Sequence, residues 1–138
     1  MNSSCYNSAL KILVRRENSQ LELRQKLKLK DFEEQEIDET ILKLQQQNYQ
    51  NDERFAGEFV QMRFNQGKGK ALIKMQLQAK GIDSFDFSEF DFLALCKDIK
   101  LKKYGQEKYQ SLKEKSSQIR FLQSRGFSFE EINSSIEN

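Results

Sequence analysis

The amino-acid sequence predicts an all-α fold in which three-helix units repeat in tandem and stack as a short curved solenoid. The 138 residues include no proline and only 6 glycines, so few positions interrupt a helix. Apolar residues recur at helical spacing along most of the chain, and alternating β-branched runs are missing. One short motif also appears three times, at intervals of 50 and 45 residues, a period typical of stacked helical units.

The spacing of apolar and capping residues predicts about nine helices. Ser19 with Glu22, and Ser128 with Glu131, have the spacing of a capping box, which marks the start of a helix. The expected helices cover 3–16, 19–30, 33–47, 51–65, 70–80, 84–90, 91–103, 108–124 and the residues after 128. Their inward-facing stripes are Tyr6, Ala9 or Leu10 and Leu13; Leu23 and Leu27; Ile37, Ile41 and Leu44; Phe55, Phe59 and Met62; Ile73 and Leu77; Phe92, Leu95 and Ile99; Leu112, Ile119 and Leu122; Ile132 and Ile136.

The helix at 51–65 has the clearest start signal. Asn51 or Asp52 can act as its N-cap, and Asp52 and Glu53 place negative charge in the first turn, where the backbone dipole favours it. The segment 83–104 is the hardest to assign, because its four phenylalanines fit neither a helical nor a strand period. We expect a short helix at 84–90 and another from 91 that ends at Gly105, with one continuous helix as the alternative.

The repeated motif has a physical explanation as a helix–turn–helix corner. Glycine adopts a left-handed backbone without steric cost, so it commonly stands just after a helix and lets the next residue fold back onto the residue five positions earlier. We expect three repeats, at about 3–49, 50–90 and 91–138, within a single domain spanning 1–138. The three copies of the motif are Leu27-x2-Lys30-Asp31-Phe32, Leu77-x2-Lys80-Gly81-Ile82 and Leu122-x2-Arg125-Gly126-Phe127.

Positive charge gathers in the second half of the chain. The formal net charge is +2, but residues 1–60 carry two more acids than bases, whereas residues 61–138 carry four more bases than acids. Basic runs attract polyanions through counterion release, although a solvated lysine-rich face is the simpler interpretation. A base before each corner also suits the negative end of the helix dipole. The candidate binding residues are Arg54, Arg63, Lys68, Lys70, Lys74, Lys80, Lys102, Lys103, Lys113, Arg120 and Arg125.

The residue types argue against several kinds of chemistry. The chain has no histidine and only two cysteines, too few for a zinc site or a histidine-activated nucleophile. Of these, Cys96 is expected to be a small buried residue and Cys5 to lie near a fraying end. The run 67–70 (G-K-G-K) lacks the full phosphate-loop pattern and follows no predicted strand. We therefore expect no enzyme, metal or cofactor. We also expect a cytoplasmic monomer without a membrane segment, since no apolar run approaches 18 residues.

Three groups of residues in this chain form one recognisable pattern. The first is Asp52-x-Arg54-Phe55-Ala56-x-Glu58 with 67–69 (G-K-G) and Lys80-Gly81-Ile82. The second is 120–127 (R-F-L-x2-R-G-F), and the third is Leu13-x2-Arg16 with Ser19 and 22–27 (E-L-R-x-K-L). Together these groups resemble the RecX family, whose members modulate the RecA recombinase, and the likeness extends over roughly residues 8–138. Asp31, where glycine would be expected, and Gly57, inside a helix, are departures from the family pattern.

The resemblance implies a function that the residues alone do not. RecX-like proteins are curved arrays of three-helix units that dock in the groove of the RecA–DNA filament and suppress its ATPase, strand-exchange and coprotease activities. We therefore expect a non-catalytic inhibitor of RecA whose partners are the RecA filament and, through phosphate contacts, single- or double-stranded DNA. The alternative is a general DNA-binding helical repeat that acts without RecA.

Overall fold

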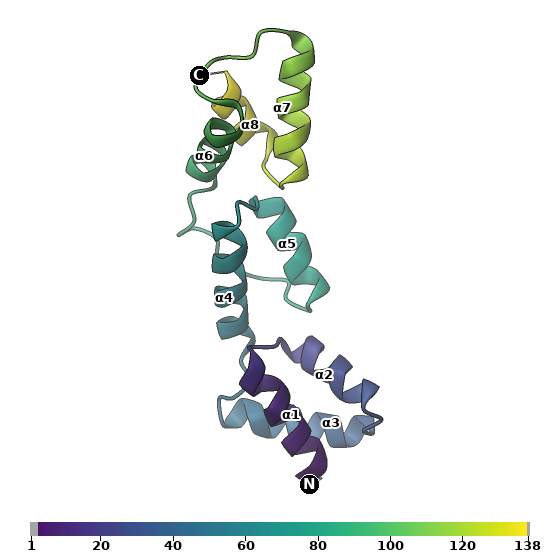
Figure 1. The fold of residues 1–138 in the computed structure, drawn as a ribbon. Coiled ribbons are helices and arrows are strands. Elements are labelled where there is room, and N and C mark those ends of the chain that lie inside the picture. Colours follow the sequence, from purple (N-terminus) through teal and green to yellow (C-terminus); the bar gives the residue numbers. More distant parts are fainter. Residues whose placement is uncertain (1–2, 138) are drawn as a thin grey trace. The chain divides into compact units, whose positions relative to one another are not determined.

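The computed structural model describes residues 3–137, and these residues form helices and connecting turns without a strand. The bounds of the eight helices are α1 Ser3–Arg15, α2 Gln20–Leu29, α3 Glu34–Gln46, α4 Asp52–Asn65, α5 Lys70–Ala79, α6 Phe92–Tyr104, α7 Leu112–Ser124 and α8 Phe129–Ile136 (Figure 1). The chain divides into two compact units. One takes the chain up to Phe59 together with Leu77–Asp83, and the other takes Val60–Gln76 together with the chain from Ser84.

Each unit has a core built from the predicted stripes. In the first unit, α1, α2 and α3 form one group of three helices around a buried cluster (Figure 1). In the second unit, α6, α7 and α8 form another. The first cluster consists of Cys5, Ala9, Leu23, Leu27, Ile37, Ile41 and Leu44. The second consists of Cys96, Leu122, Phe127, Ile132 and Ile136.

The three predicted corners are confirmed, and they share one pattern of hydrogen bonds. After α2, Asp31 has a φ of 66°, and the N–H of Phe32 donates to the Leu27 carbonyl (3.4 Å). The N–H of Ile82 donates to Leu77 O (3.0 Å), and that of Phe127 donates to Leu122 O (3.2 Å). Together with the bond from the residue before, this is the Schellman ending of a helix. The leucine of each corner is at most 2% exposed, so the three copies are structurally equivalent.

Two further helices end in the same way, close to the predicted positions, although the left-handed residue was not predicted for either. Asn48, with φ 62°, ends α3, and the N–H of Tyr49 donates to Leu44 O (2.8 Å). Gly67, with φ 81°, ends α4, and the N–H of Lys68 donates to Arg63 O (3.0 Å). Asparagine and glycine are the two residues that tolerate this backbone best, so residue type was the available signal.

The helix expected at 84–90 does not form, and the continuous helix is also absent. Residues 82–91 form no helix, and their one backbone hydrogen bond of a turn runs from the N–H of Phe90 to Phe87 O (3.0 Å). Phe85, Phe87, Phe90 and Phe92 instead form a chain of ring contacts, with centroids 4.9 to 6.3 Å apart, and two of them contact Phe64 of α4 at 5.3 Å. A helix would turn residues 85 and 87 to nearly opposite sides. An extended segment lets all the rings join one cluster, and apolar burial outweighs local propensity.

Three expectations within the helices are also wrong. Met62 is 47% exposed, whereas Ala56 and Val60 are buried beside Phe55 and Phe59, so the inward face of α4 is rotated from the predicted one. Leu112 is 79% exposed, because it is the first residue of α7, which was expected to begin at 108. Ser111 is the N-cap of this helix, and its Oγ accepts a hydrogen bond from the N–H of Glu114. Cys5, expected near a fraying end, lies fully buried in α1.

Lys100 organises the loop between α6 and α7. Only 5% of this residue is exposed, and its Nζ donates to the carbonyls of Gly105 (2.9 Å) and Glu107 (3.4 Å). We expect Lys100→Met, which keeps the length and removes the donors, to lower the free energy of unfolding by about 1–3 kcal/mol. Denaturant unfolding followed by circular dichroism measures this. Lys97→Met, at an exposed position of the same helix, should change it by less than about 0.5 kcal/mol.

Candidate functional site

Several residues that define the family resemblance meet in a polar network in the first unit. Asn18 and Ser19, in the turn between α1 and α2, are fully buried. Asp52 Oδ1 accepts from the N–H of Gln20 (2.8 Å) and from Gln50 Nε2 (3.0 Å), and Gln50 Nε2 also lies 3.2 Å from Asn18 O. Asn51 is the residue that caps α4, through a 3.0 Å bond from the Arg54 N–H. Asp52 is therefore free to satisfy the start of α2 instead.

Glu22 is the centre of charge in this network. Its Oε1 accepts from the N–H of Ser19 (3.1 Å), which completes the predicted capping box, and its Oε2 accepts from Lys80 Nζ (2.8 Å) and Arg16 Nη2 (3.2 Å). Burial by itself would raise the pKa of Glu22. The hydrogen bonds from Lys80, Ser19 and Arg16 outweigh burial, so the pKa of Glu22 is lowered. The carboxylate thus joins α2 to the corner after α5.

Arg54 and Lys80, two of the predicted binding residues, make intramolecular contacts here. Arg54 pairs with Glu17 and also donates to the Tyr49 carbonyl (3.1 Å). Lys80 Nζ lies 5.5 Å from the centre of the Phe59 ring in addition to its bond with Glu22. A role for either in binding a partner stays a prediction, but their observed contacts hold the first unit together.

The glycine pair at 67 and 69 has a structural function in the second unit. The N–H of Gly69 donates to Arg125 O (2.6 Å), and that of Ala71 donates to Gly126 O (3.1 Å), so the start of α5 rests on the corner after α7. The side chain of Arg125 also contacts the turn after α4: its Nε donates to Gly67 O (3.2 Å) and its Nη2 donates to Gln66 O (2.8 Å). The two glycines are therefore explained by backbone packing rather than by a bound phosphate.

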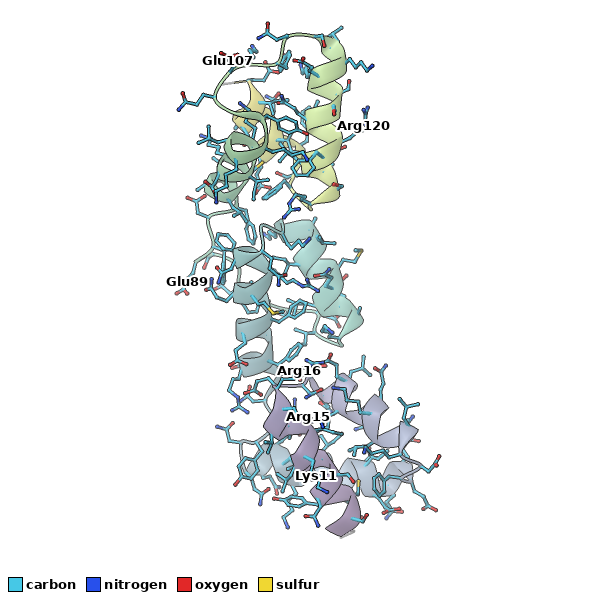
Figure 2. All side chains as sticks on the ribbon, viewed as in Figure 1. Lys11, Arg15, Arg16, Glu89, Glu107 and Arg120 are labelled. Atoms are coloured by element: carbon cyan, nitrogen blue, oxygen red, sulfur yellow. The ribbon has the colours of Figure 1, made fainter. Side chains whose placement is uncertain are left out.

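The other predicted binding residues lie in the second unit, and intramolecular contacts occupy several of them. Lys102 pairs with Asp98 (3.0 Å). Lys103 Nζ lies 4.3 Å from the Phe121 ring centre, and Lys70 Nζ lies 5.5 Å from that of Phe87. Arg63 donates to Gln66 Oε1 (3.0 Å) and Lys68 is half-buried. The predicted binding residues that are exposed and make neither an ion pair nor a ring contact within 3–137 are Lys74, Lys113 and Arg120, the last labelled on α7 in Figure 2.

Acidic residues pair with some of the bases in the run at 97–125. Glu137 pairs with both Lys108 (3.3 Å) and Lys115 (3.1 Å), and it also accepts from the Tyr109 hydroxyl (2.8 Å). The hydrogen bond from Tyr109 and the one from Lys115 lower the pKa of Glu137. Because these bases are paired within the unit, the number of lysines in the sequence overstates the charge available to a partner.

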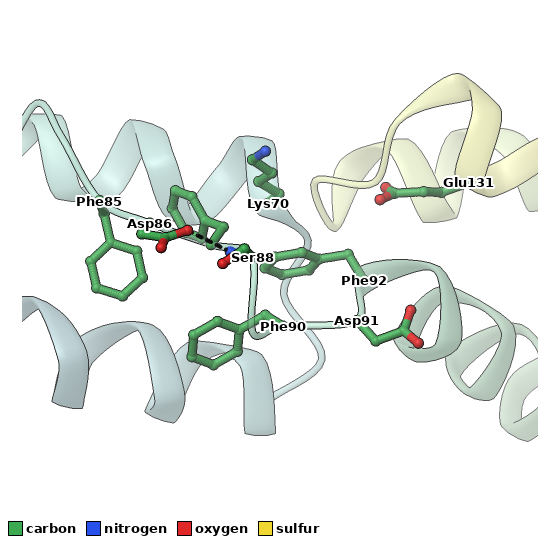
Figure 3. Close-up of a pocket in the computed structure, with 9 residues that line it drawn as sticks. Lys70, Phe85, Asp86, Ser88, Phe90, Asp91, Phe92 and Glu131 are labelled. Carbon is green, nitrogen blue, oxygen red and sulfur yellow. Dashed lines mark hydrogen bonds between the residues drawn. The ribbon is translucent and has the colours of Figure 1, made fainter.

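The segment 85–92, which carries the four clustered phenylalanines, lines a hollow of about 520 Å³ in the second unit (Figure 3). Asp86 Oδ1 accepts from the N–H of Ser88 (2.9 Å), which fixes the turn and lowers the pKa of Asp86. Asp86, Asp91 and Glu131 line the hollow, with Lys70 as its one base. Three carboxylates facing a single lysine repel a phosphate group, so this hollow does not suit one.

A second hollow, of about 570 Å³, lies in the first unit and was not predicted. Lys11, Arg15, Arg16, Lys26 and Lys30 line it together with Ser8 and Ile12, and no acidic residue does. Counting charges along the sequence does not reveal this basic pocket, because residues 1–60 carry a net negative charge. The available signal was the spacing: Lys11 with Arg15, and Lys26 with Lys30, are four residues apart and so share a helix face.

Residues 3–137 contain neither a candidate metal site nor a candidate membrane span. No three side chains of the types that bind metals lie close enough in this range to hold an ion. None of the helices described is both long and apolar enough to span a membrane.

The architecture defines the chain as an all-α repeat protein of three-helix domains with equivalent corners. Its sequence matches three successive family models, described as the first, second and third three-helix domains of RecX, over residues 5–44, 51–88 and 89–136. The chain belongs to the RecX family.

Curated relatives and a solved structure agree with this assignment. The "Regulatory protein RecX" of Pasteurella multocida is 40% identical over 140 residues, which covers 96% of this chain and 85% of the relative. That of Vibrio vulnificus is 34% identical, over 94% and 88%. The crystal structure of RecX from Lactobacillus salivarius superposes with a TM-score of 0.84 at 25% identity, over 98% of this chain and 94% of that one.

Proposed function

We propose that this protein regulates the RecA recombinase by binding the RecA–DNA filament and suppressing its ATPase, strand-exchange and coprotease activities. It acts in the cytoplasm as a monomer and needs no cofactor. The observation that carries the proposal is the match of all three RecX domains in order along the chain. Relatives named as regulatory proteins, at 33–40% identity over most of their length, support it further.

The arrangement of the side chains supports a binding role without catalysis. Glu22, Arg54, Lys80 and Arg125 serve as fixed structural contacts within their own units. The exposed bases Lys74, Lys113 and Arg120 remain for contacts with an acidic or nucleic-acid partner. A protein of this kind changes a filament by binding one of its states more tightly than another, since differential affinity alone shifts a conformational equilibrium.

We expect the purified protein to slow ATP hydrolysis by RecA filaments on single-stranded DNA at substoichiometric ratios. A regulator that acts on a cooperative filament needs fewer copies than there are RecA subunits. The measurement is a coupled ATPase assay, with co-sedimentation of the protein and filament as a second readout. An unchanged ATPase rate together with no protein in the filament pellet would contradict the proposal.

Charge reversal separates this proposal from a general DNA-binding function that needs no RecA. The double variant Lys102→Glu with Lys103→Glu removes two exposed bases near the end of α6. We expect it to retain part of its filament affinity, because protein contacts with RecA also contribute. Complete loss of filament association, with a parallel loss of binding to naked duplex DNA, would favour the general DNA-binding function.

A further inference from the structure

The basic pocket of the first unit is formed by two helices and the turn that joins them. Lys11 and Arg15 are one helical turn apart on α1, and Lys26 lies on α2 with Lys30 just after its end. Figure 2 shows Lys11 and Arg15 following one another along the C-terminal part of α1, with Arg16 just after its end. Cations therefore line the hollow from both helices.

The positive charge of this pocket is largely uncompensated. Lys11, Arg15 and Lys30 are exposed and make no ion pair with any residue in 3–137. Arg16 pairs with Glu22, but its side chain remains 55% exposed. Lys26 donates to Asn18 Oδ1 (2.6 Å), and both its burial and the nearby charge of Arg16 lower its pKa. A positive neighbour that lowers the pKa of a lysine indicates that like charges are crowded here.

The lining of the pocket indicates a ligand with regularly spaced negative charges. Residues four apart on a helix are separated by about 6 Å along its axis, close to the spacing of successive phosphates on one nucleic-acid strand. Arginine side chains bind phosphate oxygens through two parallel N–H groups, and lysines add point charge. No aromatic residue lines the pocket, so it offers no surface on which a base would stack.

We propose that the basic pocket, defined by Lys11, Arg15, Arg16, Lys26 and Lys30, binds the sugar–phosphate backbone of a nucleic acid. Binding is independent of sequence, because the cations of the lining contact phosphates, which carry no sequence information. This binding needs no RecA. The proposal can therefore be tested independently of the regulation of RecA proposed above. It also assigns nucleic-acid contact to the half of the chain with net negative charge.

The test measures binding of the full chain to a short fluorescent oligonucleotide, single-stranded and duplex, by anisotropy without RecA. For the wild type, the logarithm of the association constant should fall linearly with the logarithm of salt concentration between about 50 and 200 mM. The triple variant K11Q/R15Q/K30Q should reduce this slope by about 2 for the single strand and about 3 for the duplex. Its affinity at the lower salt should fall about 10- to 100-fold.

A charge-matched variant controls for the loss of three positive charges. K28Q/K43Q/K97Q alters three lysines outside the pocket, and its slope should change by less than about 1. The proposal is overturned if both triple variants lose affinity equally, if the wild type does not bind, or if poly-glutamate binds as tightly as the oligonucleotide and through the same residues. The single variant R15Q replaces an exposed side chain that makes no ion pair within 3–137, and it should lower the slope by about 1. This variant tests the proposal if the triple variant folds poorly.

Discussion

Replacement of Gly69 by alanine is expected to destabilise the second unit by about 3–5 kcal/mol. A Cβ at this position would lie 2.3 Å from the Gly126 carbonyl carbon and 2.6 Å from the backbone nitrogen of Phe127. Both are backbone atoms within a corner fixed by its own hydrogen bonds, so neither can move aside at small cost. The substitution would also pull apart the 2.6 Å bond from Gly69 N to Arg125 O.

Gly57→Ala is the matched control for this substitution. Gly57 lies within α4 on a helical backbone, and a methyl group there would meet no neighbouring part of the structure within 4 Å. Alanine should therefore stabilise the protein by about 0.5–1 kcal/mol. Denaturant unfolding followed by far-ultraviolet circular dichroism, which reports helix content, compares the two. Equal effects of the two substitutions, or a loss at Gly69 below about 1 kcal/mol, would mean that the two backbones do not approach closely in solution.

Glu22→Gln is expected to lower the free energy of unfolding by about 2–3 kcal/mol near neutral pH. Glutamine keeps the size of the side chain and can still accept from the N–H of Ser19. It removes the charge that faces Lys80 and Arg16, and the carboxylate side chain is only 12% exposed. The loss is therefore that of a largely buried charge pair rather than of a surface one.

The effect of Glu22→Gln should depend on pH with a defined sign. The folded protein lowers the pKa of Glu22 below its ordinary value of 4.5, so the carboxylate stabilises the fold above pH 4.5. This stabilisation is lost as the pH falls through the lowered pKa, because Glu22 then takes up a proton. Wild type and variant should thus differ most near neutral pH and converge in acid.

Unfolding free energies measured at several pH values test this. Glu34→Gln is the control, since Glu34 makes only a 3.7 Å pair with Lys28 in which both side chains are more than half exposed. It should change stability by less than about 0.5 kcal/mol at any pH. A difference between wild type and Glu22→Gln that stays constant down to about pH 3 would show that Glu22 acts through packing rather than through charge.

Several residues of the family motif stabilise the unit in which they lie. Asp52, Arg54 and Lys80 contact the α1–α2 region, and Gly69 and Arg125 join α5 to the corner after α7. A sequence motif shows which residue types occur at given positions, but it does not show whether binding of a partner or folding requires them. The contacts that we propose with a filament or with DNA are better sought among the exposed bases that make no ion pair within 3–137.

Local signals in the sequence were enough to predict most helix ends. Ser19 with Glu22 and Ser128 with Glu131 form the two predicted capping boxes, and Gly105 follows the last residue of α6 as expected. These features depend on residues within a few positions of one another, and capping energies are set locally. The repeated corners were predicted for the same reason, because each is one six-residue pattern.

The all-α class, the three equivalent corners and the core leucines at 27, 77 and 122 follow from local patterns in the amino-acid sequence. Contacts between distant residues set the conformation of 84–90, where ring contacts with Phe64 replace a helix. They also set which cations remain available to a partner. Charge counted along a chain ignores pairing, and pairing depends on residues as distant as Glu22 and Lys80 or Lys108 and Glu137. For that reason acidic residues pair with three bases of the most basic stretch, Lys102, Lys108 and Lys115, whereas a pocket in the more acidic half carries largely uncompensated positive charge.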